Sequence, residues 1–131
     1  MKPLHILICD DDKVGRHLLQ IMLKRMKNVE ADFAENGAEG LEKFIRNSNY
    51  DLIITDLDMP DISGEELIKI VREDFNSDIP IMIATGSYLG DVQALVAQYN
   101  VNDVLIKPYK PIELRASILE HTSQEYAFVS C

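Results

Sequence analysis

The sequence contains no tryptophan and only two cysteines among its 131 residues. Cys9 and Cys131 stand at opposite ends of the chain, and they match neither a zinc-ligand spacing nor a disulfide framework. Positive charge is also scarce: the sequence has 13 Lys and Arg residues but 22 Asp and Glu residues, which gives a formal net charge of -9. Nucleic acid and anionic lipid surfaces attract proteins with the opposite balance, so direct binding to either is disfavoured.

The sequence also lacks a long apolar run. No stretch approaches the ~18 consecutive apolar residues of a membrane-spanning helix, and the first residues show no signal-peptide cleavage pattern. We therefore expect a soluble, cytoplasmic protein without a membrane partner. Its 131 residues, 47% of them hydrophobic, suit a single domain, which typically has about 100 to 150 residues. No linker, repeat or low-complexity stretch divides the chain.

Five short segments have the composition of β-strands. Four of them are nearly continuous apolar runs, typical of strands in a parallel sheet that is covered on both faces; they span residues 4–9, 52–55, 79–85 and 104–106. The fifth segment, residues 29–33, alternates apolar and polar side chains. Such alternation indicates one solvated face, so we expect this strand at an edge of the sheet.

Helical patterns separate the predicted strands. In the first of them, apolar residues recur at the spacing of one helix face, at Val14, Leu18, Ile21 and Met22. Ser63, with Glu66 three residues later, forms a capping box that predicts the start of another helix. Strict alternation of five strands and five helices predicts an α/β fold, a doubly wound parallel sheet with helices on both faces. In such folds, functional sites form at the carboxyl ends of the strands.

Polar residues stand at the ends of four predicted strands, and the fold would gather them at one edge; they are Asp10, Asp11, Asp12, Asp56, Asp58, Thr85 and Lys107. Two carboxylates about 4 Å apart repel by roughly 4 kcal/mol at an effective dielectric constant near 20. The cluster must therefore hold a proton, pair with Lys107 or bind a cation. Mg²⁺ favours oxygen ligands, and an aspartate can serve as the nucleophile of phosphoryl transfer. The pattern thus suits Mg²⁺-assisted phosphoryl transfer.

Each of these residues also has an ordinary structural interpretation. Asp12 alone is best explained as the N-cap of the first helix, and Asp56 alone as a turn residue after a strand. Thr85 alone is typical of strand interiors. Their coincidence at one sheet edge favours a functional site.

The ordered set of motifs resembles the receiver domain of bacterial two-component response regulators. The resemblance extends from about residue 4 to residue 119 and is carried by Asp10-Asp11-Asp12, Asp56, Met59-Pro60, Gly64, Thr85 and Lys107-Pro108. It implies a flavodoxin-like single domain with strand order 2-1-3-4-5 and five helices. We expect the receiver domain to occupy residues 1–124, with a C-terminal tail at residues 125–131.

The resemblance also implies a phosphodonor and a cofactor. Asp56 would accept a phosphoryl group from a sensor histidine kinase, a histidine phosphotransfer protein or a small phosphodonor. Mg²⁺ would be bound by the carboxylates of Asp11 and Asp56, by the backbone carbonyl of Asp58, and by Asp10 through water.

Two further site residues take their roles from the same resemblance. Thr85 and Lys107 would bind the phosphoryl oxygens, and the bond from Lys107 to Pro108 would be cis, which proline makes energetically accessible. The domain would be a regulatory element, not an enzyme, catalysing only its own phosphorylation and dephosphorylation. Phosphorylation adds nearly two negative charges and would switch the face of the fourth helix, fifth strand and fifth helix toward a downstream protein or a fused output domain.

Two residues depart from the family pattern. Val104 occupies the position of the usual switch aromatic, so the signal would travel through Thr85 and loop movement, or with a contribution from Tyr109. Asp58 adds a carboxylate two residues after the acceptor. We expect it to increase the demand for a cation and to alter the lifetime of the phosphoryl group.

Two alternative functions remain open at this point. The Asp56-Leu57-Asp58 motif also resembles haloacid-dehalogenase-type phosphatases, although Met59-Pro60 follows it and the chain leaves little room for a cap domain. A docking module without phosphate control is the other alternative, supported by Val104 alone. The sequence leaves the kinase, the output partner and the oligomeric state open, and it suits both a single-domain messenger and the amino-terminal part of a longer regulator.

Overall fold

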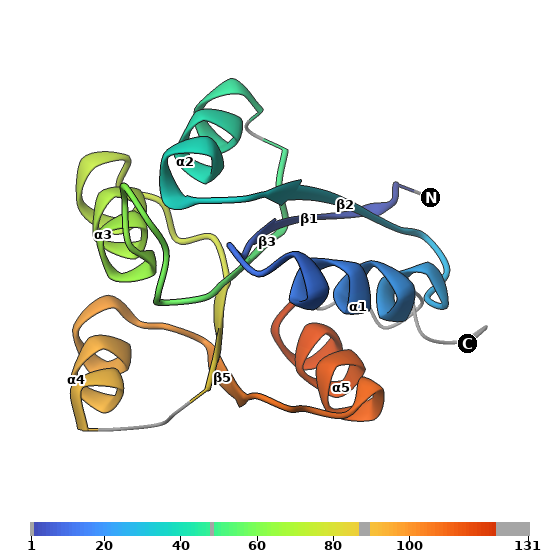
Figure 1. Ribbon diagram of the computed structural model, residues 1–131. Coiled ribbons are helices and arrows are strands. Elements are labelled where there is room, and N and C mark those ends of the chain that lie inside the picture. Colours follow the sequence, from blue (N-terminus) through green and yellow to red (C-terminus); the bar gives the residue numbers. More distant parts are fainter. Residues whose placement is uncertain (1, 48, 87–89, 123–131) are drawn as a thin grey trace.

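The computed structural model describes residues 2–47, 49–86 and 90–122 (Figure 1). Within them, parallel strands form a five-stranded sheet in the order β2-β1-β3-β4-β5. The strands are β1 (Leu4–Cys9), β2 (Val29–Ala34), β3 (Leu52–Thr55), β4 (Ile81–Thr85) and β5 (Asp103–Ile106). The predicted strand order and the edge position of the second strand are confirmed. The predicted tail at residues 125–131 lies outside the described residues, and so does the boundary at residue 124.

Helices alternate with the strands, as predicted. They are α1 (Lys13–Lys24), α2 (Gly37–Arg46), α3 (Gly64–Lys69), α4 (Gly90–Tyr99) and α5 (Pro111–Thr122), and α3 continues into a π-helical turn, η1 (Ile70–Asp74). Helices α1 and α5 cover one face of the sheet, while α2, α3 and α4 cover the other (Figure 1). The flavodoxin-like fold is therefore confirmed. Among the helices described, none combines the length and the apolar character that crossing a membrane requires.

Within the described residues, side-chain caps begin three of the helices, α1, α2 and α3. Asp12 accepts hydrogen bonds from the backbone N–H groups of Val14 and Gly15 at 3.3 and 3.2 Å, which confirms its structural role. The Ser63 hydroxyl accepts from the Glu66 N–H at 3.1 Å, which is the N-cap half of the predicted capping box, and it donates to the Glu66 carboxylate at 3.3 Å. Each such cap stabilises a helix by about 1 kcal/mol.

The sheet separates two apolar cores. Successive side chains of a strand point to opposite faces, so Leu7 of β1 packs with residues of α3 and α4, while Ile6 and Ile8 pack with α1 and α5. Because both faces are covered, the inner strands need apolar residues at every position. This explains their continuous hydrophobic runs.

One expectation about α1 is wrong in part. The helix is present and Met22 of its predicted apolar face packs against the core, but Val14, Leu18 and Ile21 are 65%, 50% and 42% exposed. Leu19 and Leu23 are buried in their place. The helix carries two adjacent apolar stripes, and contact with the sheet selects between them. An exposed apolar stripe is left on the surface of α1.

Candidate functional site

Backbone hydrogen bonds hold the strand-end residues at the carboxyl edge of the sheet. The N–H of Asp10 donates to Ala34 O at 3.1 Å, and the N–H of Asp56 donates to Cys9 O at 2.9 Å. The N–H of Lys107 likewise donates to Thr85 O at 2.7 Å. These bonds extend the pairing of neighbouring strands by one residue. The sheet therefore brings together side chains that are 97 and 51 residues apart in the chain.

Lys107 joins two carboxylates at this edge. Its Nζ donates to Asp56 Oδ2 at 2.8 Å and to Asp10 Oδ2 at 3.0 Å. Burial opposes the charge of the ammonium group, but the hydrogen bonds and negative charges of Asp56 and Asp10 outweigh it and raise the pKa of Lys107. Lys107 is therefore a fixed positive charge at any physiological pH.

Three carboxylates converge beside this ammonium group. Asp10, Asp11 and Asp56 each offer an oxygen within 4.8 Å of the others. Asp10 is buried and Asp11 is exposed, so the cluster opens to solvent on one side. One ammonium charge cannot neutralise three carboxylates. A hard divalent cation with oxygen ligands would balance the remainder, and Mg²⁺ has those preferences.

The Asp56 carboxylate is also held from its own loop. Its Oδ1 atom accepts hydrogen bonds from the N–H groups of Leu57 at 2.7 Å and Asp58 at 3.3 Å. This loop packs against the start of α3 so closely that a Cβ at Gly64 would lie 1.9 Å from the Asp56 carbonyl oxygen. A larger residue at position 64 would displace the acceptor loop, which gives a physical reason for glycine there.

Two of the predicted site residues lie at the edge without joining this network. Thr85 is buried at the end of β4, and within the described residues no hydrogen bond links its hydroxyl to another side chain. The Asp58 side chain is exposed, and only its backbone N–H reaches Asp56. The bond between Lys107 and Pro108 is cis, as predicted.

One residue of the site was not predicted from the sequence. Arg16 of α1 donates from Nη1 to the backbone carbonyl of Asp10 at 2.7 Å and from Nη2 to Glu35 at 3.2 Å. It thereby holds the loop that carries the acidic residues. The available signal was its position four residues after the N-cap Asp12, one helical turn away from the acidic loop.

An apolar groove adjoins the cluster on the α1 side. It is lined by Val14, Leu18 and Met22 of α1, by Tyr109 after β5, and by Asp10 and Lys107 at the end that meets the cluster. Burial raises the pKa of Tyr109 to about 12, so its phenol is neutral. The exposed stripe of α1 thus forms one wall of a groove that leads to Asp10 and Lys107.

Comparisons with known proteins agree with this geometry. The family model described as "Response regulator receiver domain" matches residues 6–119. The chain is 38% identical over 109 residues to the transcriptional regulatory protein ResD of Bacillus subtilis, covering 83% of this chain and 44% of ResD. It is 33% identical over 116 residues to the chemotaxis protein CheY1 of Helicobacter pylori, covering 86% of this chain and 92% of CheY1. The chain therefore spans less than half of ResD and nearly all of CheY1.

A solved structure gives the same result for the fold. The Vibrio cholerae chemotaxis protein CheY4 superposes with a TM-score of 0.82 at 25% identity. The superposition covers 91% of this chain and 98% of CheY4. The similarity therefore extends over the whole sheet and its helices.

Proposed function

The chain belongs to the family of response regulator receiver domains, and we propose that it carries a cytoplasmic two-component signal by accepting a phosphoryl group on Asp56. The contact between Lys107 Nζ and Asp56 Oδ2 at 2.8 Å carries this proposal, because it sets a fixed positive charge against the nucleophile. Family membership does not favour the phosphatase and docking-module alternatives. The domain acts on no separate substrate and catalyses only its own phosphorylation and dephosphorylation.

The reaction is a phosphoryl transfer between two side chains. A carboxylate oxygen of Asp56 attacks the phosphorus of a phosphohistidine, the new P–O bond forms, and the P–N bond breaks. The leaving imidazole nitrogen keeps the electron pair and takes up a proton. Lys107, already beside the carboxylate, then pairs with the phosphoryl oxygens, and the Thr85 hydroxyl donates to one of them.

Mg²⁺ is the proposed cofactor. Asp11 and Asp56 would hold it through their carboxylates, Asp58 through its backbone carbonyl, and Asp10 through water. The convergence of three carboxylate oxygens within 4.8 Å supports this assignment. When bound, the ion offsets the negative charge of the acidic residues and of the incoming phosphoryl oxygens.

The groove on α1 is the proposed contact surface for the phosphodonor protein, a sensor histidine kinase or histidine phosphotransfer protein. Its apolar wall includes the exposed Val14 and Leu18, and its far end includes Asp10 and Lys107. A partner that covers the apolar wall therefore brings its histidine next to the acceptor carboxylate. The output partner, a downstream protein or a fused output domain, would contact the face formed by α4, β5 and α5.

Phosphorylation by a small donor tests the proposal directly. The protein is incubated with Mg²⁺ and acetyl phosphate, and its mass is measured. We expect the mass of one phosphoryl group to be added to wild type and to Asp58→Asn, but not to Asp56→Asn. The Asp58→Asn control also tests whether that carboxylate changes the lifetime of the phosphoryl group. An unmodified wild-type protein that also shows no response to beryllium fluoride would support the docking module instead.

A further inference from the structure

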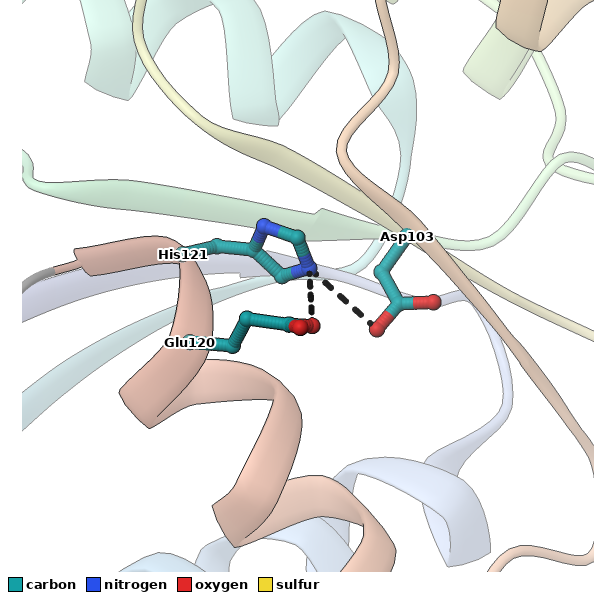
Figure 2. Close-up of side chains that lie close together, drawn as sticks. All are labelled: Asp103, Glu120 and His121. Atoms are coloured by element: carbon teal, nitrogen blue, oxygen red, sulfur yellow. Dashed lines mark ion pairs between the residues drawn. The ribbon is translucent and has the colours of Figure 1, made fainter.

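A second cluster of ionisable side chains lies at the opposite end of β5. Asp103 is the first residue of that strand, and Glu120 and His121 stand in the last turn of α5. Figure 2 shows the His121 ring directed at both carboxylates. Its Nε2 atom lies 3.1 Å from Glu120 Oε2 and 3.4 Å from Asp103 Oδ2.

The Nε2 atom of His121 has no hydrogen-bond partner among the described residues, although it is buried. Buried polar atoms are normally paired, so such an atom calls for a specific explanation. Here the unpaired nitrogen lies next to two oxygens that are metal ligands in many proteins. A neutral imidazole offers a lone pair at this position, and a bound cation would satisfy all three groups at once.

We propose that Asp103, Glu120 and His121 bind a divalent transition metal of the zinc class. Two ligand atoms that each lie about 2.0 to 2.1 Å from zinc at the tetrahedral angle are roughly 3.3 Å apart. The observed separations of 3.1 and 3.4 Å bracket that value. All three ligand atoms lie within 4.8 Å of one another. One imidazole nitrogen with two carboxylates, and a water in the fourth position, is a ligand set that zinc accepts.

Neighbouring groups orient the carboxylate of Asp103. The Ser117 hydroxyl of α5 donates to Asp103 Oδ2 at 2.5 Å, and the N–H of Val104 donates to Asp103 Oδ1 at 2.8 Å. Such outer-shell hydrogen bonds hold a ligand in the position that the metal needs. The Glu120 side chain is exposed and leaves a path from solvent. A metal here would tie the end of α5 to the start of β5.

The imidazole distinguishes this site from the acidic cluster at the other end of the strand. Mg²⁺ prefers oxygen ligands alone, whereas zinc binds imidazole readily. The test therefore uses a background of Asp11→Asn, Asp56→Asn and Cys131→Ser, which removes two acidic ligands of the first cluster and a thiol. The background lacks Asp56, so the result is independent of the proposed phosphorylation.

Calorimetric titration with zinc, and cobalt absorption in the visible range, measure binding in this background. We expect one metal per chain, with His121→Gln and Asp103→Asn each weakening binding by more than ~10-fold, the least effect of losing an outer-shell partner. Ser117→Ala, which removes an outer-shell partner only, should weaken binding by about 10-fold. His17→Gln, on the exposed surface of α1, is the matched histidine control and should bind as the background does.

Two results would overturn the proposal. One is the absence of zinc binding in the background protein. The other is a His121→Gln variant that binds zinc as tightly as the background. If circular dichroism shows that His121→Gln is unfolded, Glu120→Gln provides the same test, because its exposed side chain can be changed without disturbing the core.

Discussion

The two ends of β5 carry the same arrangement, a nitrogen between two carboxylates, with different chemistry. At the carboxyl end, the Lys107 ammonium lies 2.8 Å from Asp56 and 3.0 Å from Asp10. At the amino end, the His121 ring lies 3.1 Å from Glu120 and 3.4 Å from Asp103. An ammonium group has three donors and no lone pair, so it can hold anions but cannot bind a metal. A neutral imidazole has a lone pair on one ring nitrogen, so it can bind a metal.

The two clusters at the ends of β5 also differ in how far their carboxylates are buried. The side chains of Asp10 and Asp56 are 3% and 13% exposed, whereas those of Asp103 and Glu120 are 34% and 70% exposed. Charges that are removed from water depend on their partner, while exposed charges are stabilised by solvent. The carboxyl-end cluster is therefore part of the stability of the fold. The carboxylates of the amino-end cluster depend less on a partner, because solvent stabilises them.

Loss of Lys107 should have the largest effect. We expect Lys107→Ala to abolish phosphorylation by acetyl phosphate and to lower the free energy of unfolding by about 3 kcal/mol, because two buried carboxylates lose their partner. Urea denaturation measures the change in stability. Lys110→Ala, at an exposed lysine three residues on, is the control and should change it by less than about 0.5 kcal/mol. Equal stability of the two variants would contradict the role of burial.

A charge in the groove on α1 should slow phosphoryl transfer from a protein donor without affecting transfer from a small-molecule donor. Leu18→Asp places a carboxylate in the apolar wall, and a partner that covers the wall would then lose the roughly 1.5 kcal/mol or more that burial of the leucine contributes. We expect transfer from a phosphohistidine protein to slow by about 10-fold or more, with labelling by acetyl phosphate unchanged. Ile45→Asp, at an exposed apolar residue of α2, is the control and should leave both reactions unchanged. Equal slowing with both donors would exclude the groove as the contact surface.

Removal of Asp11 should reveal repulsion at the carboxyl end. In the absence of divalent ions, Asp11→Asn should raise the free energy of unfolding by about 1 kcal/mol, the repulsion of two charges 4 Å apart in water. It should also weaken Mg²⁺ binding. Glu120→Gln, at the exposed amino-end cluster, should leave stability unchanged under the same conditions. Thermal unfolding in chelator measures both, and a lower melting temperature for Asp11→Asn would contradict the repulsion.

A further histidine, His5, provides a contrast to His121. Nε2 of His5 in β1 is hydrogen-bonded to Asp32 Oδ2 at 3.0 Å, and the Tyr50 hydroxyl donates to the same oxygen at 2.6 Å. This ring nitrogen has a hydrogen-bond partner, whereas Nε2 of His121 has none among the described residues. The hydrogen bond from Tyr50 lowers the pKa of Asp32. Burial opposes this shift, and the charge and hydrogen bond of His5 add to it.

Because the pKa of Asp32 is lower in the folded protein, its stabilisation is fully present above the unfolded value of about 3.9 and is lost as the pH falls further. We expect Tyr50→Phe to lower the free energy of unfolding by about 1 kcal/mol at neutral pH. The difference from wild type should shrink as the pH falls below about 4. Urea denaturation at pH 7 and pH 3 tests this, and a difference that does not depend on pH would assign the effect to packing.

Most of the fold was predictable from patterns along the chain. Continuous apolar runs and one alternating strand indicated a buried parallel sheet with β2 at its edge, because side-chain burial follows the covered faces. The strand expected at residue 79 begins at Ile81, after Pro80, which lacks a backbone N–H to donate to the sheet. The positions of Asp56, Thr85 and Lys107 at strand ends could also be predicted, because these residues lie at the ends of the apolar runs.

Other features depend on three-dimensional packing. The choice between two apolar stripes on α1 was made by contact with the sheet, and it left Val14 and Leu18 exposed. Gly64 is required by the approach of the Asp56 carbonyl, which no local pattern reveals. Asp103 lies on a strand, and Glu120 and His121 lie in the last turn of a helix. Their spacing in the sequence therefore does not predict that they come together.

The chain alone was sufficient for the class of fold, the family resemblance and the residues at the strand ends, because periodicity and strand-end chemistry are local properties. Tertiary structure alone decided which carboxylates Lys107 joins, which face of α1 is exposed, and where His121 meets its two acidic neighbours. These outcomes depend on distances between segments that are far apart in the chain, and only the packed sheet sets those distances.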